Sequence, residues 1–93
     1  AKDLPDKRYS AIALNSLGKV NFIIGNYQKA AEHFQKSVEI CRNIKNKRLE
    51  ATVLGNLAQT FFAIGETEKA KGLLNEALII NRALVDKVTE AAI

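Results

Sequence analysis

The stretch LNSLGKVNFIIGN at residues 14–26 returns as LGNLAQTFFAIGE at residues 54–66. Both copies have leucine at positions one and four, phenylalanine at position nine, and isoleucine-glycine at positions eleven and twelve. The interval is 40 residues, and it extends further, since Lys29-Ala30 aligns with Lys69-Ala70 and Arg42 with Arg82. A period of roughly 20–50 residues is typical of proteins that stack copies of one small unit. The sequence therefore predicts a repeat architecture, whose function resides on a surface rather than in a catalytic centre.

An aspartate or asparagine followed by lysine marks the boundaries of the units. The pair occurs at Asp6-Lys7, Asn46-Lys47 and Asp86-Lys87, at the same interval. These boundaries divide a single domain, residues 1–93, into unit one at 7–46, unit two at 47–86 and the start of a third unit at 87–93. Because the chain begins with Ala1 and the repeat is cut at both ends, we expect a piece of a longer array.

Each unit is predicted to consist of two helices. In unit one, apolar residues at helical spacing run up to Gly25-Asn26, where glycine can end a helix in the left-handed conformation. The next helix is expected over residues 27–44, and Asn46 is expected to adopt the turn that follows. Unit two repeats the scheme around Gly65-Glu66-Thr67, and Pro5-Asp6 offers a cap and a stiff entry to the first helix. The fold class is therefore all-α, with four main helices and a short C-terminal stub.

Apolar and small residues at helical spacing indicate the core. In the first helices, Leu14, Leu17 and Ile24 are expected to be core positions. In the second helix of unit one, we expect a buried stripe of Ala30, Ala31, Phe34, Val38, Cys41 and Ile44. Glycine inside a helix costs about 1 kcal/mol relative to alanine. This cost is best explained by two helices in close approach, which suits Gly18 and the equivalent Ala58.

Composition excludes several classes of function. The formal net charge of +4 is spread along the chain, whereas a nucleic-acid interface needs basic residues clustered on one face. The densest basic stretch, residues 42–48, lies at a predicted helix end, where bases favour the helix dipole. No apolar run reaches the roughly 20 residues that span a bilayer. We therefore expect no nucleic-acid partner, no membrane association and a cytoplasmic location.

Catalysis and cofactor binding find little support in the sequence. His33 is the only histidine and Cys41 the only cysteine, eight residues apart. Two turns of helix separate them, which is too far to share one metal ion without further ligands. Cys41 is expected to be a small core residue rather than a nucleophile. We expect no enzyme activity, no cofactor and no metal.

The repeated residues resemble the tetratricopeptide repeat (TPR). The family pattern has a large apolar residue, leucine and a small residue on the first helix, glycine at the turn, and small, large and small residues on the second helix. Those positions hold Leu14, Leu17, Gly18, Gly25, Ala30, Phe34 and Ser37 in unit one, and Leu54, Leu57, Ala58, Gly65, Ala70, Leu74 and Ala77 in unit two. The resemblance covers nearly the whole chain. It implies a right-handed α-α superhelix, or solenoid, whose first helices line the concave side.

The unit is longer than the usual length of about 34 residues. The extra residues fall at the end of the second helix, where Arg42 and Arg82 replace the usual proline. Asn21 replaces an aromatic residue that unit two keeps as Phe61. The 40-residue form is similar to the repeats of G-protein-signalling modulators, kinesin light chains and bacterial TPR regulators.

From the resemblance, a concave groove for a peptide or partner is expected on the first helices. Its predicted residues are Ile12, Asn15, Ser16, Lys19, Phe22, Ile23, Thr52, Asn56, Gln59 and Phe62. The amides of Asn15, Asn56 and Gln59 would bond the backbone of an extended peptide, and Lys19 would meet an acidic group.

Each of these residues also has a structural interpretation. Phe22 and Phe62 either grip apolar side chains of a ligand or pack between neighbouring first helices. Asn56 either serves a ligand or bonds the neighbouring helix, and Lys19 is either an anchor or a solvated charge. The carboxylate clamp of chaperone-binding relatives is not expected, because Asn15 and Lys19 hold the relevant positions with the residue types exchanged.

The predicted function is a protein-protein interaction module or scaffold within a longer array. Its partner would be a peptide or domain, either from another protein or from the same parent chain. The alternative is a structural spacer in a larger regulatory or signalling protein, without a ligand of its own. A fragment that lacks capping helices could also dimerise through the uncovered apolar sides of its end helices, or residues 88–93 could pack elsewhere as a displaced helix.

Overall fold

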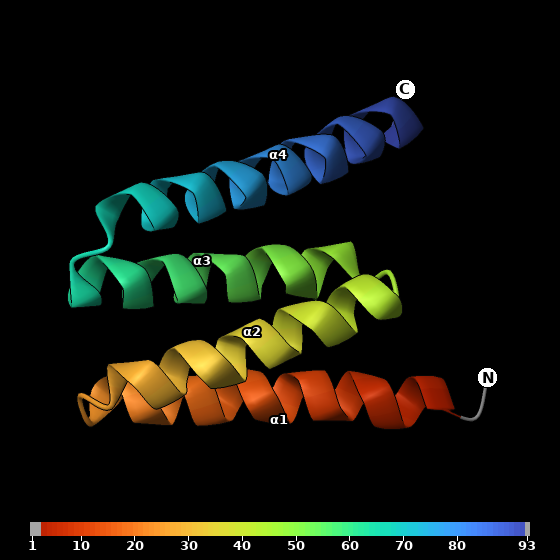
Figure 1. Cartoon of the computed structure of the whole chain (residues 1–93). Coiled ribbons are helices and arrows are strands. Elements are labelled where there is room, and N and C mark those ends of the chain that lie inside the picture. Colours follow the sequence, from red (N-terminus) through yellow and green to blue (C-terminus); the bar gives the residue numbers. More distant parts are fainter. Residues whose placement is uncertain (1–2, 93) are drawn as a thin grey trace.

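A computed structural model describes residues 3–92 of the chain, with the side chains of residues 7–87. It contains four α-helices: α1 (Asp3–Ile23), α2 (Tyr27–Asn43), α3 (Lys47–Ile64) and α4 (Thr67–Ala92). No strand occurs within residues 3–92. Successive helices run in opposite directions and stack in sequence order from α1 to α4, so that both ends of the chain lie on the same side (Figure 1). The all-α prediction is confirmed.

The two turns within the units are closed by glycine, as predicted. Gly25 has φ 85° and Gly65 has φ 96°, both in the left-handed region that a residue with a β-carbon avoids. The amide of Gly25 donates to the Phe22 carbonyl at 3.0 Å, and the amide of Gly65 donates to the equivalent Phe62 carbonyl at 3.1 Å. The same helix ending therefore recurs 40 residues apart.

The turn between the units differs from the prediction. Asn46 was expected to adopt the turn conformation, but Lys45 takes the left-handed backbone, with φ 59°, and Asn46 has φ −88°. Asn46 is the N-cap of α3, and its side-chain oxygen accepts a hydrogen bond from the Leu49 amide at 3.2 Å. An asparagine cap needs an extended backbone so that its short side chain can reach the first turn. The left-handed residue is therefore the one before it.

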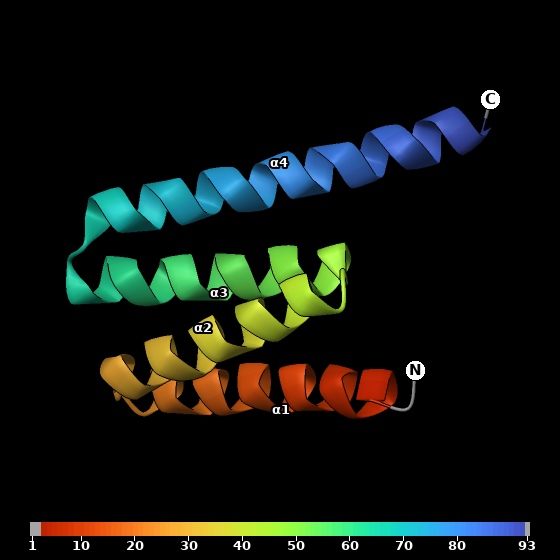
Figure 2. The same cartoon turned by 45° about the vertical axis from the view of Figure 1, so that its right-hand side comes forward.

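Both ends of the helical region also depart from the sequence-based boundaries. Helix α1 begins at Asp3, so Pro5 lies in its first turn, where a proline does not interrupt the hydrogen bonding. Helix α4 continues through Asp86-Lys87 to Ala92, so the expected C-terminal stub is a collinear extension of α4 (Figure 2). Val85 aligns with Lys45, and a β-branched residue resists the left-handed conformation that a turn would require there. Side-chain packing of residues 88–93, and all of Ile93, lie outside the described part of the chain.

The core lies where α3 is covered by α2 on one side and α4 on the other. Its buried residues are Ala30, Ala31, Phe34, Val38, Val53, Leu54, Leu57 and Ala77. Leu57 of α3 is 3% exposed, whereas the equivalent Leu17 of α1 is 48% exposed. Ile24 is also exposed and Leu14 is half-buried, so the prediction that these first-helix residues are core was wrong for unit one. The cause is position in the stack, because α1 packs against α2 alone apart from a slight contact with α3.

The close approach expected at Gly18 is confirmed. A β-carbon on Gly18 would lie 2.5 Å from Cε1 of the Phe34 ring, well inside van der Waals contact. The equivalent Ala58 is fully buried. The other two helical glycines, Gly55 and Gly72, have no atoms within 4 Å of the same position apart from the neighbouring backbone of their own helices, so close packing does not account for them.

Candidate functional site

The predicted groove residues of α1 and α3 are joined by a hydrogen bond between two amides. Asn56 on α3 donates through Nδ2 to Oδ1 of Asn15 on α1, at 2.9 Å. Both side chains are half-buried. This bond is the one that the structural interpretation of Asn56 predicted, since it links neighbouring first helices. It also fixes how both amides face the surface.

Next to this bond, a small hollow of 150 Å³ opens between α1 and α3. Five of the ten predicted groove residues line it together with the core residue Phe34. The five are Lys19, Phe22, Ile23, Asn56 and Gln59. They come from the C-terminal half of each first helix, and the buried Phe34 of α2 closes the hollow between them.

The apolar part of the hollow is held in place by the fold. Phe22 packs against the core cluster, and its ring meets the edge of the Tyr27 ring with centroids 5.2 Å apart and an interplanar angle of 62°. Aromatic rings favour this edge-to-face geometry. Phe22 therefore packs against the core and against Tyr27 of α2, and one side of it still lines the hollow. Ile23 beside it is exposed.

The polar part of the hollow is open to solvent. Lys19 and Gln59 are exposed. Among residues 7–87, the ion pairs involve Arg42, Lys47 and Lys69, and none involves Lys19. The ammonium group of Lys19 is therefore accessible to a ligand that carries negative charge.

Asn15, which bonds Asn56, and four further predicted residues do not line this hollow. The four are exposed on the same two helices, at Ile12, Ser16, Thr52 and Phe62. The Thr52 hydroxyl donates within its own helix to the Arg48 carbonyl at 3.2 Å. Phe62 is 43% exposed, so it is available as an apolar contact at a separate position on α3.

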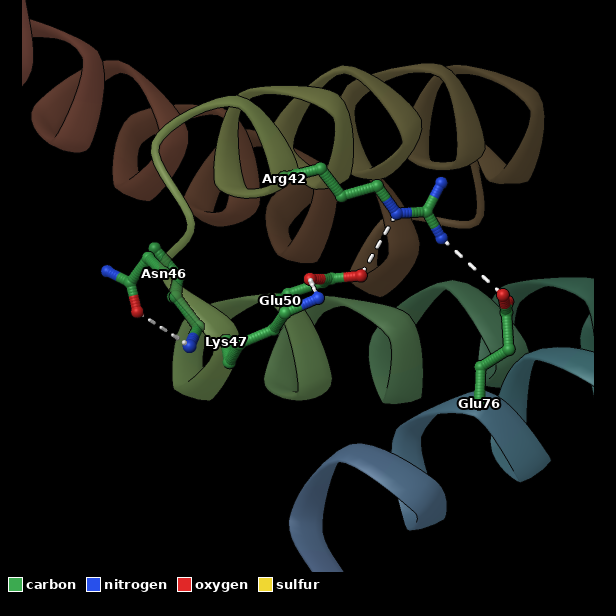
Figure 3. A network of polar contacts seen from close by, with 6 residues as sticks. Arg42, Asn46, Lys47, Glu50 and Glu76 are labelled. Atoms are coloured by element: carbon green, nitrogen blue, oxygen red, sulfur yellow. Dashed lines mark hydrogen bonds and ion pairs between the residues drawn. The ribbon is translucent and has the colours of Figure 1, made fainter. Parts of the chain in front are cut away.

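A polar network that the sequence analysis did not find joins the two units. Glu50 at the start of α3 is only 3% exposed, and its Oε2 accepts a hydrogen bond from Nε of Arg42 at 3.0 Å. Lys47 lies 3.4 Å from the other carboxylate oxygen, and Arg42 also reaches Glu76 of α4 at 3.6 Å. Figure 3 shows Arg42 between the two carboxylates. The recurrence of Arg42 as Arg82 and of Glu50 as Glu90 was the signal that could have revealed it.

Cys41 lies beside this network and is buried. Its burial raises the pKa of the thiol above the ordinary value; a hydrogen bond with Ser37 lowers it, and the Glu50 carboxylate raises it. A thiol with a raised pKa is mostly protonated near neutral pH and is a poor nucleophile. Among the side chains that the structure describes, no three histidine, cysteine or acidic residues lie close enough to hold a metal ion. In the same part of the chain, no helix is long and apolar enough to cross a membrane.

Four antiparallel helices in two equivalent pairs, closed by equivalent left-handed glycines, define a helical-repeat protein. The model of the tetratricopeptide repeat family matches residues 9–83 of the sequence. The chain therefore belongs to the tetratricopeptide repeat family, whose members generally mediate protein-protein interactions and are typically not enzymes. Searches of curated proteins and of solved structures found no significant match.

Proposed function

We propose that the surface formed by α1 and α3 binds an extended peptide segment of a partner protein. The observation that carries this proposal is the hollow in which Lys19, Phe22, Ile23, Asn56 and Gln59 gather from two separate units. The hollow has the volume of about five water molecules at ~30 Å³ each, enough room for one apolar side chain.

The amide pair gives the surface a way to bond a peptide backbone. Because Nδ2 of Asn56 donates to Oδ1 of Asn15, the pair retains the Nδ2 group of Asn15 as a donor and Oδ1 of Asn56 as an acceptor. One donor and one acceptor match the two polar groups of a peptide unit. The bond between the units and the proposed ligand contact are therefore compatible uses of the same two side chains.

The remaining side chains suggest the character of the bound segment. Phe22 and Ile23 favour an apolar side chain in the hollow, and the exposed ammonium of Lys19 favours an acidic residue beside it. Gln59 can donate to or accept from the neighbouring backbone. With few contacts on two units, the affinity is expected to be micromolar or weaker, that is, a binding free energy of about −8 kcal/mol at most.

Peptides that bind the chain can be selected from a random display library and measured by titration calorimetry. The test variant is Lys19→Glu with Gln59→Ala, and the matched control is Lys71→Glu, which makes the same charge change on α4. We expect the test variant to lose at least tenfold in affinity and the control to change little. Equal affinity for both variants, with circular dichroism showing that both are folded, would rule out this surface.

A structural spacer is the second candidate, and the outer faces of the stack favour it. Leu17 and Val20 on α1 and Ile24 directly after it are exposed, as are Leu78 and Val85 on α4. Apolar faces of this kind are where neighbouring repeats stack in longer arrays, and they are also where two isolated copies could associate. Light scattering over a range of concentrations tests the second outcome, since a constant monomer mass excludes dimerisation.

A further inference from the structure

A second and larger hollow lies at the turn between α2 and α3. Its volume is 680 Å³, and it is bounded by α1, the turn, the first residues of α3 and one residue of α4. Among residues 7–87, eight line the hollow; four of these are cations and none is acidic. The cations are Arg8, Lys45, Lys47 and Arg48. No residue is shared with the hollow between α1 and α3, so the two are separate candidate sites.

Within the part of the chain whose side chains are described, the charge of this hollow is only partly neutralised. Lys47 lies 3.4 Å from a carboxylate oxygen of Glu50, but that carboxylate is also bonded by Arg42. Within residues 7–87, no ion pair involves Arg8, Lys45 or Arg48. Like charges gathered around a concave surface focus the electrostatic potential and attract anionic groups. An acidic ligand would supply carboxylates to these described cations.

Lys45 occupies a position where the other turns have glycine. Its φ of 59° lies in the left-handed region, together with Gly25 and Gly65. A residue with a β-carbon is strained in this conformation, and glycine is not. Lys45 therefore supplies a cation next to the hollow, at a position where glycine would suit the left-handed backbone better.

The hollow also has apolar walls. Tyr9 on α1, Ile44 at the end of α2 and Leu84 on α4 complete its lining around Asn46. Nucleic acid is best bound by a basic stripe that follows successive phosphates, and a membrane surface by an amphipathic helix with a basic face. Cations and apolar side chains around one concavity instead fit a short peptide with acidic groups on both sides of an apolar residue.

We propose that this hollow is a second binding site, which takes an acidic peptide segment with one apolar side chain. The site uses the turn between units rather than the surface of α1 and α3. This hollow and the proposed groove share no described lining residue, so each can be tested with its own variants.

The test uses a fluorescent, end-capped peptide, Glu-Asp-Glu-Leu-Glu-Asp-Glu, titrated with the whole chain and followed by fluorescence anisotropy. One control peptide replaces every acid with its amide, and a second replaces leucine with glycine. We expect the acidic peptide to bind, its affinity to fall as salt is added, and both controls to bind more weakly by about fivefold or more. Equal binding of the amide peptide, or no binding of the acidic peptide, would overturn the proposal.

Variants of the chain locate the site. Arg48→Glu should weaken binding about tenfold, whereas Lys36→Glu, the same charge change at an exposed position on α2 outside the hollow, should weaken it by less than about twofold. Lys45→Gly should weaken peptide binding about threefold. Because glycine suits the left-handed backbone, this variant should be no less stable to urea than the parent, so that weaker binding reports the loss of charge and not a loss of folding. Equal losses for Arg48→Glu and Lys36→Glu would show only diffuse attraction and overturn the site.

A competition experiment tests the choice of a peptide over other anions. Single-stranded DNA of the same charge and vesicles containing phosphatidylserine are each added to the complex of chain and peptide. We expect neither to displace the peptide at equal charge concentration. Displacement by DNA or vesicles, lost again in Arg48→Glu, would reassign the hollow to that ligand and refute the peptide proposal.

Discussion

Replacing Gly18 with alanine should destabilise the protein, although alanine is the better helix former. The new β-carbon would lie 2.5, 2.6 and 2.8 Å from three atoms of the Phe34 ring. Phe34 is almost fully buried in the core cluster, so the ring has little room to withdraw. Overpacking of this kind costs up to about 3 kcal/mol, and the gain in helix propensity returns about 1 kcal/mol. The expected net loss in the free energy of unfolding is about 1–2 kcal/mol.

Gly72→Ala provides the matched control for this change. Gly72 lies inside α4, and apart from the neighbouring backbone of its own helix no atom lies within 4 Å of the position that its β-carbon would take. The same substitution should therefore raise the free energy of unfolding by about 1 kcal/mol. The opposite signs distinguish helix packing from helix propensity.

The assay is urea denaturation followed by circular dichroism, with equal slopes required for the comparison. Phe34→Leu is made in both the parent and Gly18→Ala. It should lower the free energy of unfolding less in Gly18→Ala than in the parent, because the smaller side chain leaves room for the alanine. A double-mutant cycle then gives a favourable coupling between the two positions. A Gly18→Ala chain as stable as the parent, or a coupling of zero, would refute the close contact between α1 and α2.

Two further predictions concern the junction between units. Arg42→Gln should lower the free energy of unfolding by about 1–2 kcal/mol, because it leaves the buried carboxylate of Glu50 with one fewer partner. This value is already reduced for the half-exposed guanidinium, which solvent screens. Urea denaturation measures the loss beside the exposed control Lys29→Gln, and equal losses in the two variants would contradict the prediction. The pKa of the Cys41 thiol is higher in the folded chain than the value near 9.0 of the unfolded chain. The protonated thiol therefore contributes fully to the free energy of unfolding below the unfolded pKa, and this contribution is lost as the pH rises through the folded pKa. Stability measured from neutral to strongly alkaline pH should therefore fall more steeply in the parent than in Cys41→Ala, and parallel profiles would contradict the raised pKa.

The turns and the fold class were predictable because they depend on local chemistry. Gly25 and Gly65 end their helices in the left-handed conformation, which glycine adopts readily. The glycines in the sequence therefore indicate where these helices end. The turn between units was harder to predict, since it was not evident which of Lys45 and Asn46 adopts the left-handed conformation. An asparagine suits both the left-handed and the capping position, and only the backbone shows that it caps α3.

Burial was less predictable because it depends on neighbours in the stack. Leu17 and Leu57 occupy the same position in the repeat, yet one is exposed and the other is buried. The spacing of apolar residues in the sequence shows which side of a helix is apolar. It does not show whether another helix covers that side. Lys19 and Gln59, which the resemblance assigned to one surface, line one hollow. The bond between Asn56 and a neighbouring helix was one of two interpretations of Asn56, and the sequence alone did not identify Asn15 as its partner.

The Arg42–Glu50 pair illustrates a third limit. Glutamate at the start of a helix is ordinarily explained by the helix dipole, so nothing about Glu50 alone indicates burial. The pairing follows from the geometry of the turn, which brings the end of α2 over the start of α3. Polar residues that recur at the repeat interval on both sides of a turn are therefore worth examining as pairs.

The central claim is that the surface of α1 and α3 holds a partner peptide. The most direct test is nuclear magnetic resonance of the isotope-labelled chain during titration with a library-selected peptide. The amide signals of Lys19, Phe22 and Ile23 on α1, and of Asn56 and Gln59 on α3, should shift together with one affinity, while those of α4 stay fixed. Shifts confined to α4 around Leu78 and Val85, with the first helices unchanged, would contradict the claim and move the binding surface to the outer face of the stack.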